Sequence, residues 1–260
     1  MLAAVTIGVF GLFHPLELQV EPVRGRVLVI ESGGHRQMLE GGGSVKLRAA
    51  ATVTARNGAE AAFILSVPGP GGKPRIRREF RGRLTVREED GHLTAIVEMD
   101  RETAVASIVA GENPGSPLEA QKAQAVVSRS YLIAAAPRHD GFDFCDTTHC
   151  QYLREPPAAG GAARRAQEAT KGLALTYQGR AIMALYSANC GGHTQTPADA
   201  GWKVEGYPFF GVECPVKGEI SGHRIGMCQT GSAEMARRGK TFREILEHYF
   251  PAARIEELHE

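Results

Sequence analysis

The hydrophobic pattern of the chain changes near residue 100, and this change constrains the fold more than any other feature of the sequence. Before residue 100, short runs of aliphatic and β-branched residues are separated by turns rich in glycine and proline, which is typical of short strands. After it, apolar residues recur at helical spacing between capping signals. The two patterns predict an α+β protein in which a β-rich part, 1–98, packs with a mixed helix and strand part, 99–260.

The individual elements follow from the same patterns. Strands are expected at 26–30, 51–55, 62–67, 82–86 and 93–97, with turns at 41–43, 57–58 and 68–72. Helices are expected at 101–110, 118–136, 162–171, 232–238 and 242–249, and a hairpin is expected from 173–177 and 181–186. Asp100 stands where an N-cap of the first helix belongs, and Thr241 and Glu244 have capping-box spacing for the last helix. The β-rich part offers no cluster of chemically useful groups, so we expect it to act as a scaffold or to position substrate.

The apolar run at 2–13 invites comparison with a signal peptide. It has no Lys or Arg in front and no small-residue cleavage site, and it is shorter than a membrane span. A strand at 5–13, a turn at His14 and Pro15, and an alternating strand at 16–20 fit the residues better. We therefore expect a β-hairpin here, and no export signal is evident in the chain.

The balance of charge bears on the kind of partner. The chain has 30 Lys and Arg residues against 29 Asp and Glu residues, which leaves a formal charge of +1. No basic field is available to hold a polyanion, so nucleic acid is not expected as a partner. A neutral saccharide is compatible with this balance.

One carboxylate, that of Glu112, occupies the break between two predicted helices. Gly111 can cap the first helix, which cannot continue through Asn113 because a proline follows. The next helix is expected to start with an N-cap, a proline in the first helical position and a capping-box glutamate: Ser116, Pro117 and Glu119. Glu112 should then lie on a tight loop with an accessible head group, as a general acid requires. An ordinary solvated loop glutamate is the alternative.

Two histidines and two cysteines lie within twelve residues: His139, Cys145, His149 and Cys150. Imidazole and thiolate are preferred zinc ligands, and two of each complete a tetrahedral structural site. The spacing is not that of a standard zinc finger. A Cys145–Cys150 disulfide and two free thiols are the alternatives, and the odd total of five cysteines leaves at least one outside any pairing within the chain.

Several short motifs remain, and they occur in a fixed order along the chain. The segment 111–126 is followed by Arg129 and Tyr131, and then come 146–151, 170–172 with 177–179, 186–194 and 222–231. Together they resemble the stage II sporulation protein D (SpoIID) / LytB family over roughly 80–251. The resemblance implies a peptidoglycan lytic transglycosylase of the cell envelope, with a glycan-binding cleft, and it implies that Glu112 is the catalytic acid. It also implies that some relatives bind zinc through the loop that contains Cys145 and Cys150.

The reaction implied by the resemblance needs one carboxylate. Ordinary glycosidases use two, one as acid and one as base or nucleophile, and the motifs offer no second one with an evident catalytic place. In a lytic transglycosylase one glutamate protonates the glycosidic oxygen and then takes the proton of the muramic acid C6 hydroxyl, which attacks C1 from within the sugar. Peptide-stripped strands would be cut to 1,6-anhydro-MurNAc ends, with no metal required in the chemical step.

Substrate contacts are expected from polar, aromatic and glycine residues of the motifs: Arg129, Gln151, Tyr186, Ser187, Gly191, Gly192, Thr194, His223 and Gln229. Trp202 and Tyr207 are candidates for the walls of a glycan groove, or for packing. A thiol nucleophile at Cys190 is disfavoured because relatives commonly have serine there, and Cys190 and Cys228 are expected to be small core residues. The family also includes proteins that stimulate an amidase, so a non-catalytic glycan-binding module with a cell-wall amidase as partner is the alternative function.

Overall fold

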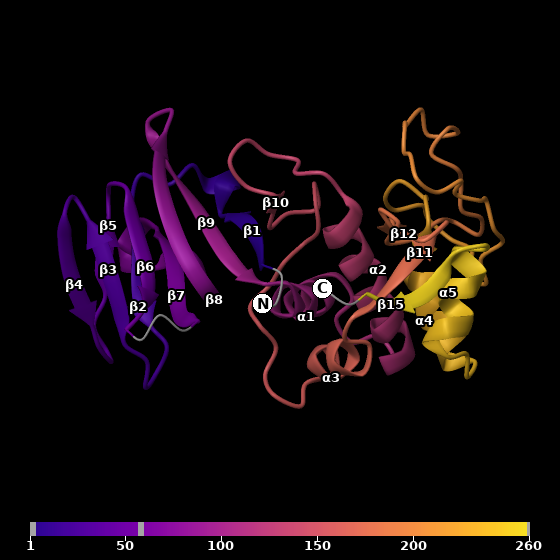
Figure 1. The fold of residues 1–260 in the computed structure, drawn as a ribbon, viewed down its shortest axis with the longest axis horizontal. Helices are drawn as coiled ribbons and strands as arrows, with labels where there is room; N and C mark the ends of the chain where they lie inside the picture. The colour runs from indigo at the N-terminus through magenta and orange to yellow at the C-terminus, as the bar shows by residue number, and fades with distance from the viewer. Residues whose placement is uncertain (1–3, 57–59, 259–260) are drawn as a thin grey trace. The chain divides into compact units, whose positions relative to one another are not determined.

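The computed structural model describes residues 4–56 and 60–258, and the chain forms two compact units. The first unit comprises Met1–Ala104 and Pro137–Pro156, and the second comprises Val105–Ala136 and Pro157–Glu260 (Figure 1). The class is α+β, which confirms the prediction. The chain first passes from one unit to the other after residue 104, whereas the border was predicted at 98. The segment 137–156 was expected in the second part but belongs to the first unit.

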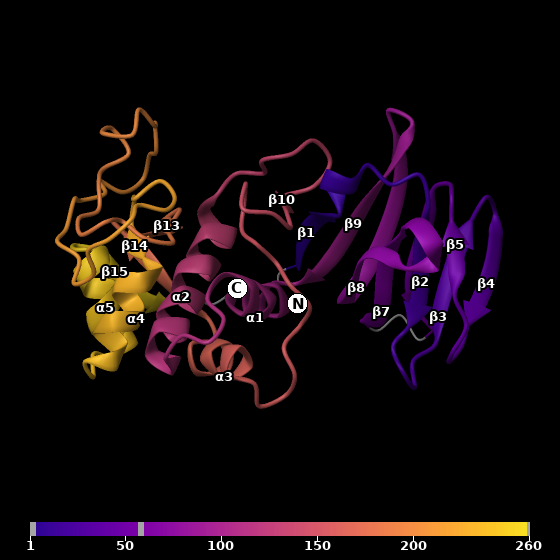
Figure 2. The same cartoon turned by 180° about the vertical axis from the view of Figure 1, so that it is seen from behind.

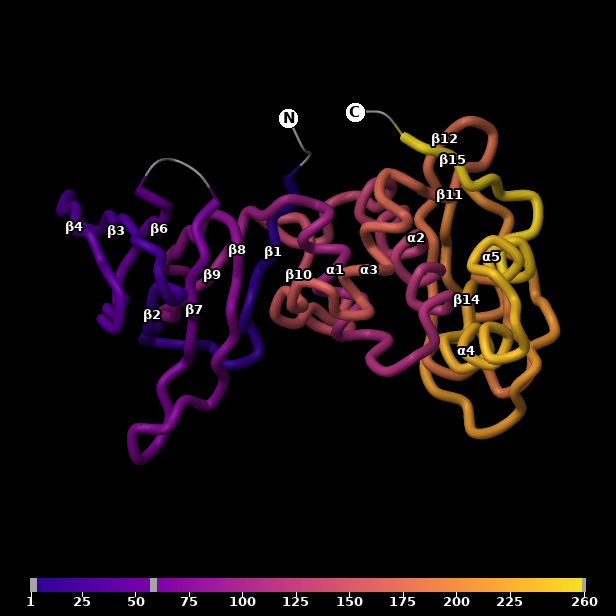
Figure 3. Tube along the Cα trace, turned by 90° about the horizontal axis from the view of Figure 1, so that it is seen from below, coloured from indigo at the N-terminus to yellow at the C-terminus, as the bar shows by residue number. Residues whose placement is uncertain are grey.

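The first unit is built from strands: β1 (Ala4–Val9), β2 (Leu18–Pro22), β3 (Leu28–Ser32), β4 (His35–Leu39), β5 (Val45–Leu47), β6 (Ala51–Ala55), β7 (Ala61–Pro68), β8 (Pro74–Glu89), β9 (His92–Asp100) and β10 (Phe144–Cys145). The main order is β10-β1-β9-β8-β6-β3-β4, and β7 pairs with both β8 and β2, while β2 also pairs with β5. The tube in Figure 3 follows these strands through the first unit. The segment 137–156 joins this unit because β10 pairs in parallel with β1.

The long strand β8 changes partners at Gly82. Its first half pairs with β7 as far as Gly82, and its second half pairs with β9 from Arg83 onward. Gly82 has a φ of 133°, and a Cβ there would overlap the carbonyl of Glu98. Glycine is therefore required at the point where the strand crosses from one partner to the other. Phe63, Phe80 and other apolar side chains of these strands are buried.

The predicted N-terminal hairpin is wrong, although both of its strands exist. β1 pairs with β9 and β10, whereas β2 pairs with β5 and β7. Between them a 3-10 turn, Gly11–Phe13, is flanked by Phe10 and His14, both in the left-handed region. This connection sends β2 away from β1 instead of back along it. Strands β4 and β5 were not predicted, and the turn expected at 57–58 lies outside the described residues.

The second unit contains α1 (Arg101–Glu112) from Val105 onward, and it contains α2 (Leu118–Ala134), α3 (Ala162–Ala169), α4 (Gln229–Arg237) and α5 (Phe242–Tyr249). Its strands are short: β11 (Leu173–Tyr177), β12 (Arg180–Ala181), β13 (Tyr186–Ser187), β14 (Met227–Cys228) and β15 (Arg254–Glu257). Helix α2 is buried along most of its length and packs against α3, α4, α5 and β11 (Figure 2). It is the central element of the unit.

The helix-capping predictions hold at two ends. Asp100 Oδ1 accepts a hydrogen bond from the N–H of Thr103 at 3.0 Å, as expected of an N-cap. Thr241 and Glu244 form the predicted capping box of α5. The predicted hairpin survives only in part, because β12 has two residues and Tyr186–Ser187 pairs in parallel with β14 instead.

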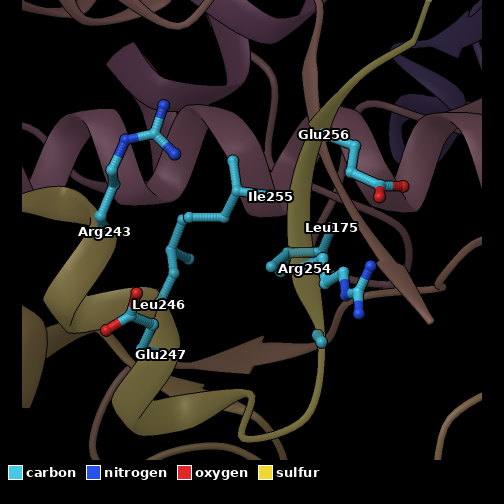
Figure 4. A pocket seen from close by; sticks show the side chains of 8 residues that line it. Leu175, Arg243, Leu246, Glu247, Arg254, Ile255 and Glu256 are labelled. Atoms are coloured by element: carbon cyan, nitrogen blue, oxygen red, sulfur yellow. The ribbon is translucent and has the colours of Figure 1, made fainter.

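A cavity of about 370 Å³ opens between α5, β15 and β11 in the second unit. Figure 4 shows Arg243 and Glu247 of α5 on one side and Arg254 and Glu256 of β15 on the other. None of its lining residues is among the predicted site residues. No helix in the described ranges is both long and apolar enough to span a bilayer.

Candidate functional site

Glu112 is the last residue of α1, and the prediction of a loop position is corrected here. Gly111 does not cap the helix, because the N–H of Asn113 still donates to the carbonyl of Val109 at 3.1 Å. The chain turns later, at Gly115, whose φ is 72°. Glu112 therefore has a backbone held by helical hydrogen bonds, and it keeps part of its surface exposed.

The start of α2 also differs from the prediction. Pro117 occupies the N-cap position, and no side chain caps the helix there. The hydroxyl of Ser116 donates to Asn113 Oδ1 instead. Both residues belong to the turn that follows Glu112, so the predicted cap has become part of the site's backbone support.

Glu119, the next carboxylate along the chain after Glu112, has a structural role. It accepts hydrogen bonds from Lys122 Nζ at 2.6 Å and from the N–H of Phe242, the first residue of α5, at 2.8 Å. Partial burial acts to raise the pKa of Glu119, but these two hydrogen bonds outweigh it and lower the pKa. Glu119 is an ionised link between α2 and α5 and not a capping-box partner in its own helix.

The carboxylate of Glu112 meets the hydroxyl of Tyr186 on β13. Burial raises the pKa of Tyr186 well above its usual value, and the charge of Glu112 and their mutual hydrogen bond raise it further. The phenol therefore stays protonated and donates to the carboxylate. Ser128 and Tyr131 of α2 also interact with Tyr186. The side chains of Ser128 and Tyr131 thus act on the Tyr186 hydroxyl that bonds to the carboxylate.

A chain of amide and hydroxyl groups connects this cluster to α4. Gln229 Nε2 donates to the backbone carbonyl of Glu112 at 3.1 Å and to Gln124 Oε1 at 3.2 Å. Gln124 Nε2 in turn donates to Ser128 Oγ at 3.1 Å. Gln124 and Ser128 are fully buried and Gln229 is 9% exposed. The network holds Glu112 at the edge of a buried polar layer, with its main chain and side chain both engaged.

His223 supports the same corner from the other side. Its ring donates to the backbone carbonyl of Tyr186, and its Nδ1 accepts from the N–H of Ile225 at 3.1 Å. Burial lowers the pKa of His223. The ring of Trp202, which is 45% exposed, lies 5.0 Å from that of His223. Trp202 is therefore the exposed aromatic surface nearest to the polar network among the residues predicted for a groove wall.

Ser187 is the last residue of β13, and Gly191 and Gly192 follow in the next loop. Ser187 is buried, and its hydroxyl has no hydrogen-bond partner within the described residues. Gly191 and Gly192 have φ values of 76° and 114°, and a Cβ at Gly191 would overlap Ile220. Their conformation serves the turn and the close approach of 217–220, so a contact with sugar stays a prediction.

Three other predicted residues are buried in structural positions. Arg129 is 1% exposed, and its Nη1 donates to the carbonyl of Leu173 at 2.9 Å, which ties α2 to β11. Thr194 is 1% exposed and accepts from the N–H of Val212 at 2.9 Å. Tyr207 is 4% exposed and donates to the carbonyl of Pro251 at 2.6 Å. These positions favour packing roles over contact with substrate.

The His/Cys loop, residues 139–150, belongs to the first unit and brings its four predicted ligands together. The candidate ligand atoms of His139, Cys145, His149 and Cys150 all lie within 4.8 Å of one another. His139 Nε2 is 3.3 Å from Cys150 Sγ, and His149 Nδ1 is 3.5 Å from Cys150 Sγ and 3.8 Å from Cys145 Sγ. Ligands of a tetrahedral zinc ion have separations of this size. The adjacent His149 and Cys150 converge because the loop turns at Thr147, whose carbonyl accepts from the N–H of Cys150.

The surroundings of Cys145 favour the ionised form of its thiol. Hydrogen bonds from Cys150 and Thr147 lower the pKa of Cys145 to about 3, and a thiolate is the form that binds metal. No disulfide joins the two cysteines in the structure. The donor set and its geometry therefore fit a structural zinc ion.

Asp146 anchors the loop to the sheet. Its carboxylate accepts from Arg78 Nη1 at 3.1 Å and from the N–H of Phe10 at 3.4 Å. Burial raises the pKa of Asp146 to about 6 against the opposing charge of Arg78. Gln151, predicted to contact substrate, is 3% exposed in the segment that follows. Asp146 therefore has a structural role in the first unit.

Gly8 is a residue that motif analysis missed. It lies opposite Cys145 in the β1–β10 pair, and a Cβ there would lie 2.5 Å from the Phe142 ring. That ring stacks on His139 at 4.6 Å. A glycine inside a predicted strand signals a close approach of this kind, so the position could have been marked in advance without its partner being known.

We expect Gly8→Ala to destabilise the protein by about 1–3 kcal/mol, because the added methyl group overpacks against Phe142. Gly11→Ala is the matched control, since a Cβ at Gly11 meets no atom within 4 Å. Chemical denaturation of the two variants makes the comparison. Equal free energies of unfolding for both would show that the Phe142 ring moves aside freely.

Comparison with known proteins agrees with the geometry. Residues 89–177 match the family model described as stage II sporulation protein, SpoIID. This stretch contains Glu112, the His/Cys loop and helix α2. An uncharacterized protein of Brachyspira hyodysenteriae is 27% identical over 146 residues, which cover 55% of this chain and 37% of that relative. The chain thus spans little more than a third of the relative's length.

The match gives the chain a domain of a cell-wall-related class. More specifically, the chain carries a SpoIID-family domain at residues 89–177, which confirms the resemblance seen in the motifs.

Proposed function

We propose that this protein is a peptidoglycan lytic transglycosylase with Glu112 as its general acid and base. The observation that carries the proposal is the hydrogen bond between the Glu112 carboxylate and the Tyr186 hydroxyl, next to the buried network of Gln124, Ser128 and Gln229. The Tyr186 hydroxyl orients the carboxylate, while the Gln229 amide holds the backbone carbonyl of Glu112. Such support suits a group that must gain and lose a proton in each cycle.

The proposed reaction cuts the MurNAc–GlcNAc bond. Protonated Glu112 gives its proton to the glycosidic oxygen while the bond from C1 to that oxygen breaks, and GlcNAc leaves with a free hydroxyl. The C6 hydroxyl of the same muramic acid then attacks C1 and returns its proton to Glu112. No water is consumed, and the tethered hydroxyl benefits from a high effective concentration.

Zinc in the His/Cys loop would have a structural part in this proposal. His139, Cys145, His149 and Cys150 would hold the ion, which would cross-link the segment before β10, β10 itself and the turn that follows it. The chemistry at Glu112 needs no metal. With peptidoglycan as its partner, the protein would act in the cell envelope, where a cell-wall amidase that strips stem peptides would supply the denuded strands.

The products distinguish transglycosylation from hydrolysis. We expect digestion of peptide-free glycan strands to yield 1,6-anhydro-MurNAc ends and no new reducing ends, because the motifs offer no second carboxylate with an evident catalytic place for activating water. Mass spectrometry of the products, with and without borohydride reduction, measures this directly. A reducible end at every cut would mean hydrolysis. Binding of strands without any cleavage would instead support a glycan-binding module that stimulates an amidase.

A further inference from the structure

Three cysteines that are far apart in the sequence meet in the core of the second unit. The sulfurs of Cys190, Cys214 and Cys228, here called the three-thiol cluster, lie within 4.8 Å of one another. Cys190 and Cys228 are fully buried, and Cys214 is 6% exposed. Cys190 and Cys228 were expected to be small core residues, and their burial alone agrees with that expectation.

The backbone around the cluster brings the three sulfurs to one point. Cys228 ends β14, which pairs in parallel with β13, and the N–H of Cys190 in the loop after β13 donates to Cys228 Sγ at 3.4 Å. The N–H of Cys214 donates to the carbonyl of Gly192 at 2.9 Å. Two separate backbone contacts thus deliver Cys190 and Cys214 to the sulfur of Cys228.

Every sulfur of the cluster accepts a hydrogen bond from a backbone N–H. The N–H of Gly192 donates to Cys190, that of Val216 donates to Cys214, and that of Gly231 donates to Cys228 at 3.4 Å. In each case the donor is two or three residues further along the chain. Backbone N–H groups directed at sulfur stabilise thiolates, and Cys228 is in addition the N-cap of α4. Thiols that only fill space need no such donors.

We propose that the three-thiol cluster is a metal site, distinct from the His/Cys loop, that binds one thiophilic d10 cation such as Zn²⁺ through three thiolates. Sulfurs bound to zinc at about 2.3 Å in a tetrahedron lie roughly 3.8 Å apart, which is within the range found here. A disulfide would use two of the sulfurs and leave the third with its hydrogen bond and no partner.

Two neighbours complete the environment of the cluster. The hydroxyl of Tyr249 lies 3.3 Å from Cys214 Sγ and offers an oxygen beside the three sulfurs. The guanidinium of Arg224 donates to the carbonyls of Cys190 and His193, at 3.1 Å and 3.0 Å, and sets a positive charge next to a site that would carry one net negative charge. Gly231 is required, because a Cβ there would overlap both Cys214 Sγ and Tyr249 Oη.

The cluster borders the carboxylate site through the chain itself. Cys228 directly precedes Gln229, which bonds to the Glu112 carbonyl, and Cys190 follows the strand that carries Tyr186. A metal ion would therefore fix the two segments that contact Glu112, one through its backbone carbonyl and one through its carboxylate. This inference concerns metal binding and does not depend on the reaction proposed above.

The test counts metal ions in the full chain. Wild-type protein and Cys214→Ser, both prepared under reducing conditions, are loaded with Zn²⁺, passed over a weak chelating resin and assayed for metal and protein. We expect Cys214→Ser to hold one equivalent fewer than the wild type. When Cd²⁺ is loaded in place of Zn²⁺, the thiolate-to-metal absorption of the variant should be lower than that of the wild type. The difference should equal the contribution of three thiolates.

A second pair of proteins isolates the cluster from the His/Cys loop. In a Cys145→Ser/Cys150→Ser background, one equivalent of Zn²⁺ should still bind and raise the melting temperature. Adding Cys214→Ser to this background should abolish both the binding and the rise in melting temperature. The circular dichroism spectrum of the metal-free protein should be the same with and without Cys214→Ser. Equal metal content in wild type and Cys214→Ser would overturn the proposal even if the background variant does not fold. A mass two hydrogens light, with two of the three thiols unreactive towards alkylation, would also overturn the proposal, because it would identify a disulfide.

Discussion

Replacing Glu112 with glutamine is expected to lower the cleavage of denuded glycan strands by about 10² to 10⁴-fold, the usual contribution of general acid–base assistance. Glutamine has nearly the same shape, and its carbonyl oxygen still accepts from the Tyr186 hydroxyl. The backbone hydrogen bond from Gln229 to residue 112 does not involve the side chain and is retained. The fold and the affinity for glycan should therefore survive while the proton donor is lost.

Glu119→Gln is the matched control, since it makes the same chemical change seven residues further along the chain. Glu119 bonds to Lys122 and to the N–H of Phe242, so this variant should lose some stability and keep its activity. Product release from purified strands, measured for both variants beside their melting temperatures, separates the two roles. Full turnover by Glu112→Gln would remove Glu112 from the mechanism, and loss of activity only in Glu119→Gln would exchange the assignments.

The second large effect is expected from removing metal from the His/Cys loop. If zinc is bound there at a free concentration about 100-fold above its Kd, it contributes about 2.7 kcal/mol, which corresponds to a fall of roughly 5–10 °C in melting temperature on chelation. Cys150→Ala should show the lower melting temperature from the start and contain one zinc equivalent fewer. The measurements are calorimetry and metal analysis.

His35→Ala is the control for that loop, because His35 is an exposed histidine of the same unit on β4. It should leave the metal content and the melting temperature unchanged. Absence of zinc from the wild-type protein, together with a mass two hydrogens light, would replace the metal by a Cys145–Cys150 disulfide.

Local signals in the sequence predicted local structure well. The capping box at Thr241 and Glu244 and the N-cap at Asp100 involve residues three apart, so the information is complete within one turn. Gly111 shows the limit of such signals. Glycine is the residue expected at a helix C-cap, but the helical hydrogen bonds continue past Gly111, and Glu112 is helical as a result.

Long-range contacts could not be predicted, and they decide the site. The pairing of β1 with β9 and β10 overrode a hairpin that suited the residues locally. Tyr186 and Gln229 were expected to touch substrate, whereas both also bond to Glu112. Gln124 and Ser128 were missed, although polar residues within the buried-helix pattern were the signal that could have found them.

The order in which the chain visits its two units has a consequence for biosynthesis. Because 137–156 returns to the first unit after 105–136 has entered the second, a ribosome must release residues well beyond α2 before β10 can add to the edge of β1. The edge of β1 that pairs with β10 therefore stays unpaired during synthesis, while part of the second unit has already been made. A nascent chain halted before residue 137 would expose the edge of β1, and this is the stage at which strand-to-strand aggregation is expected to compete with folding.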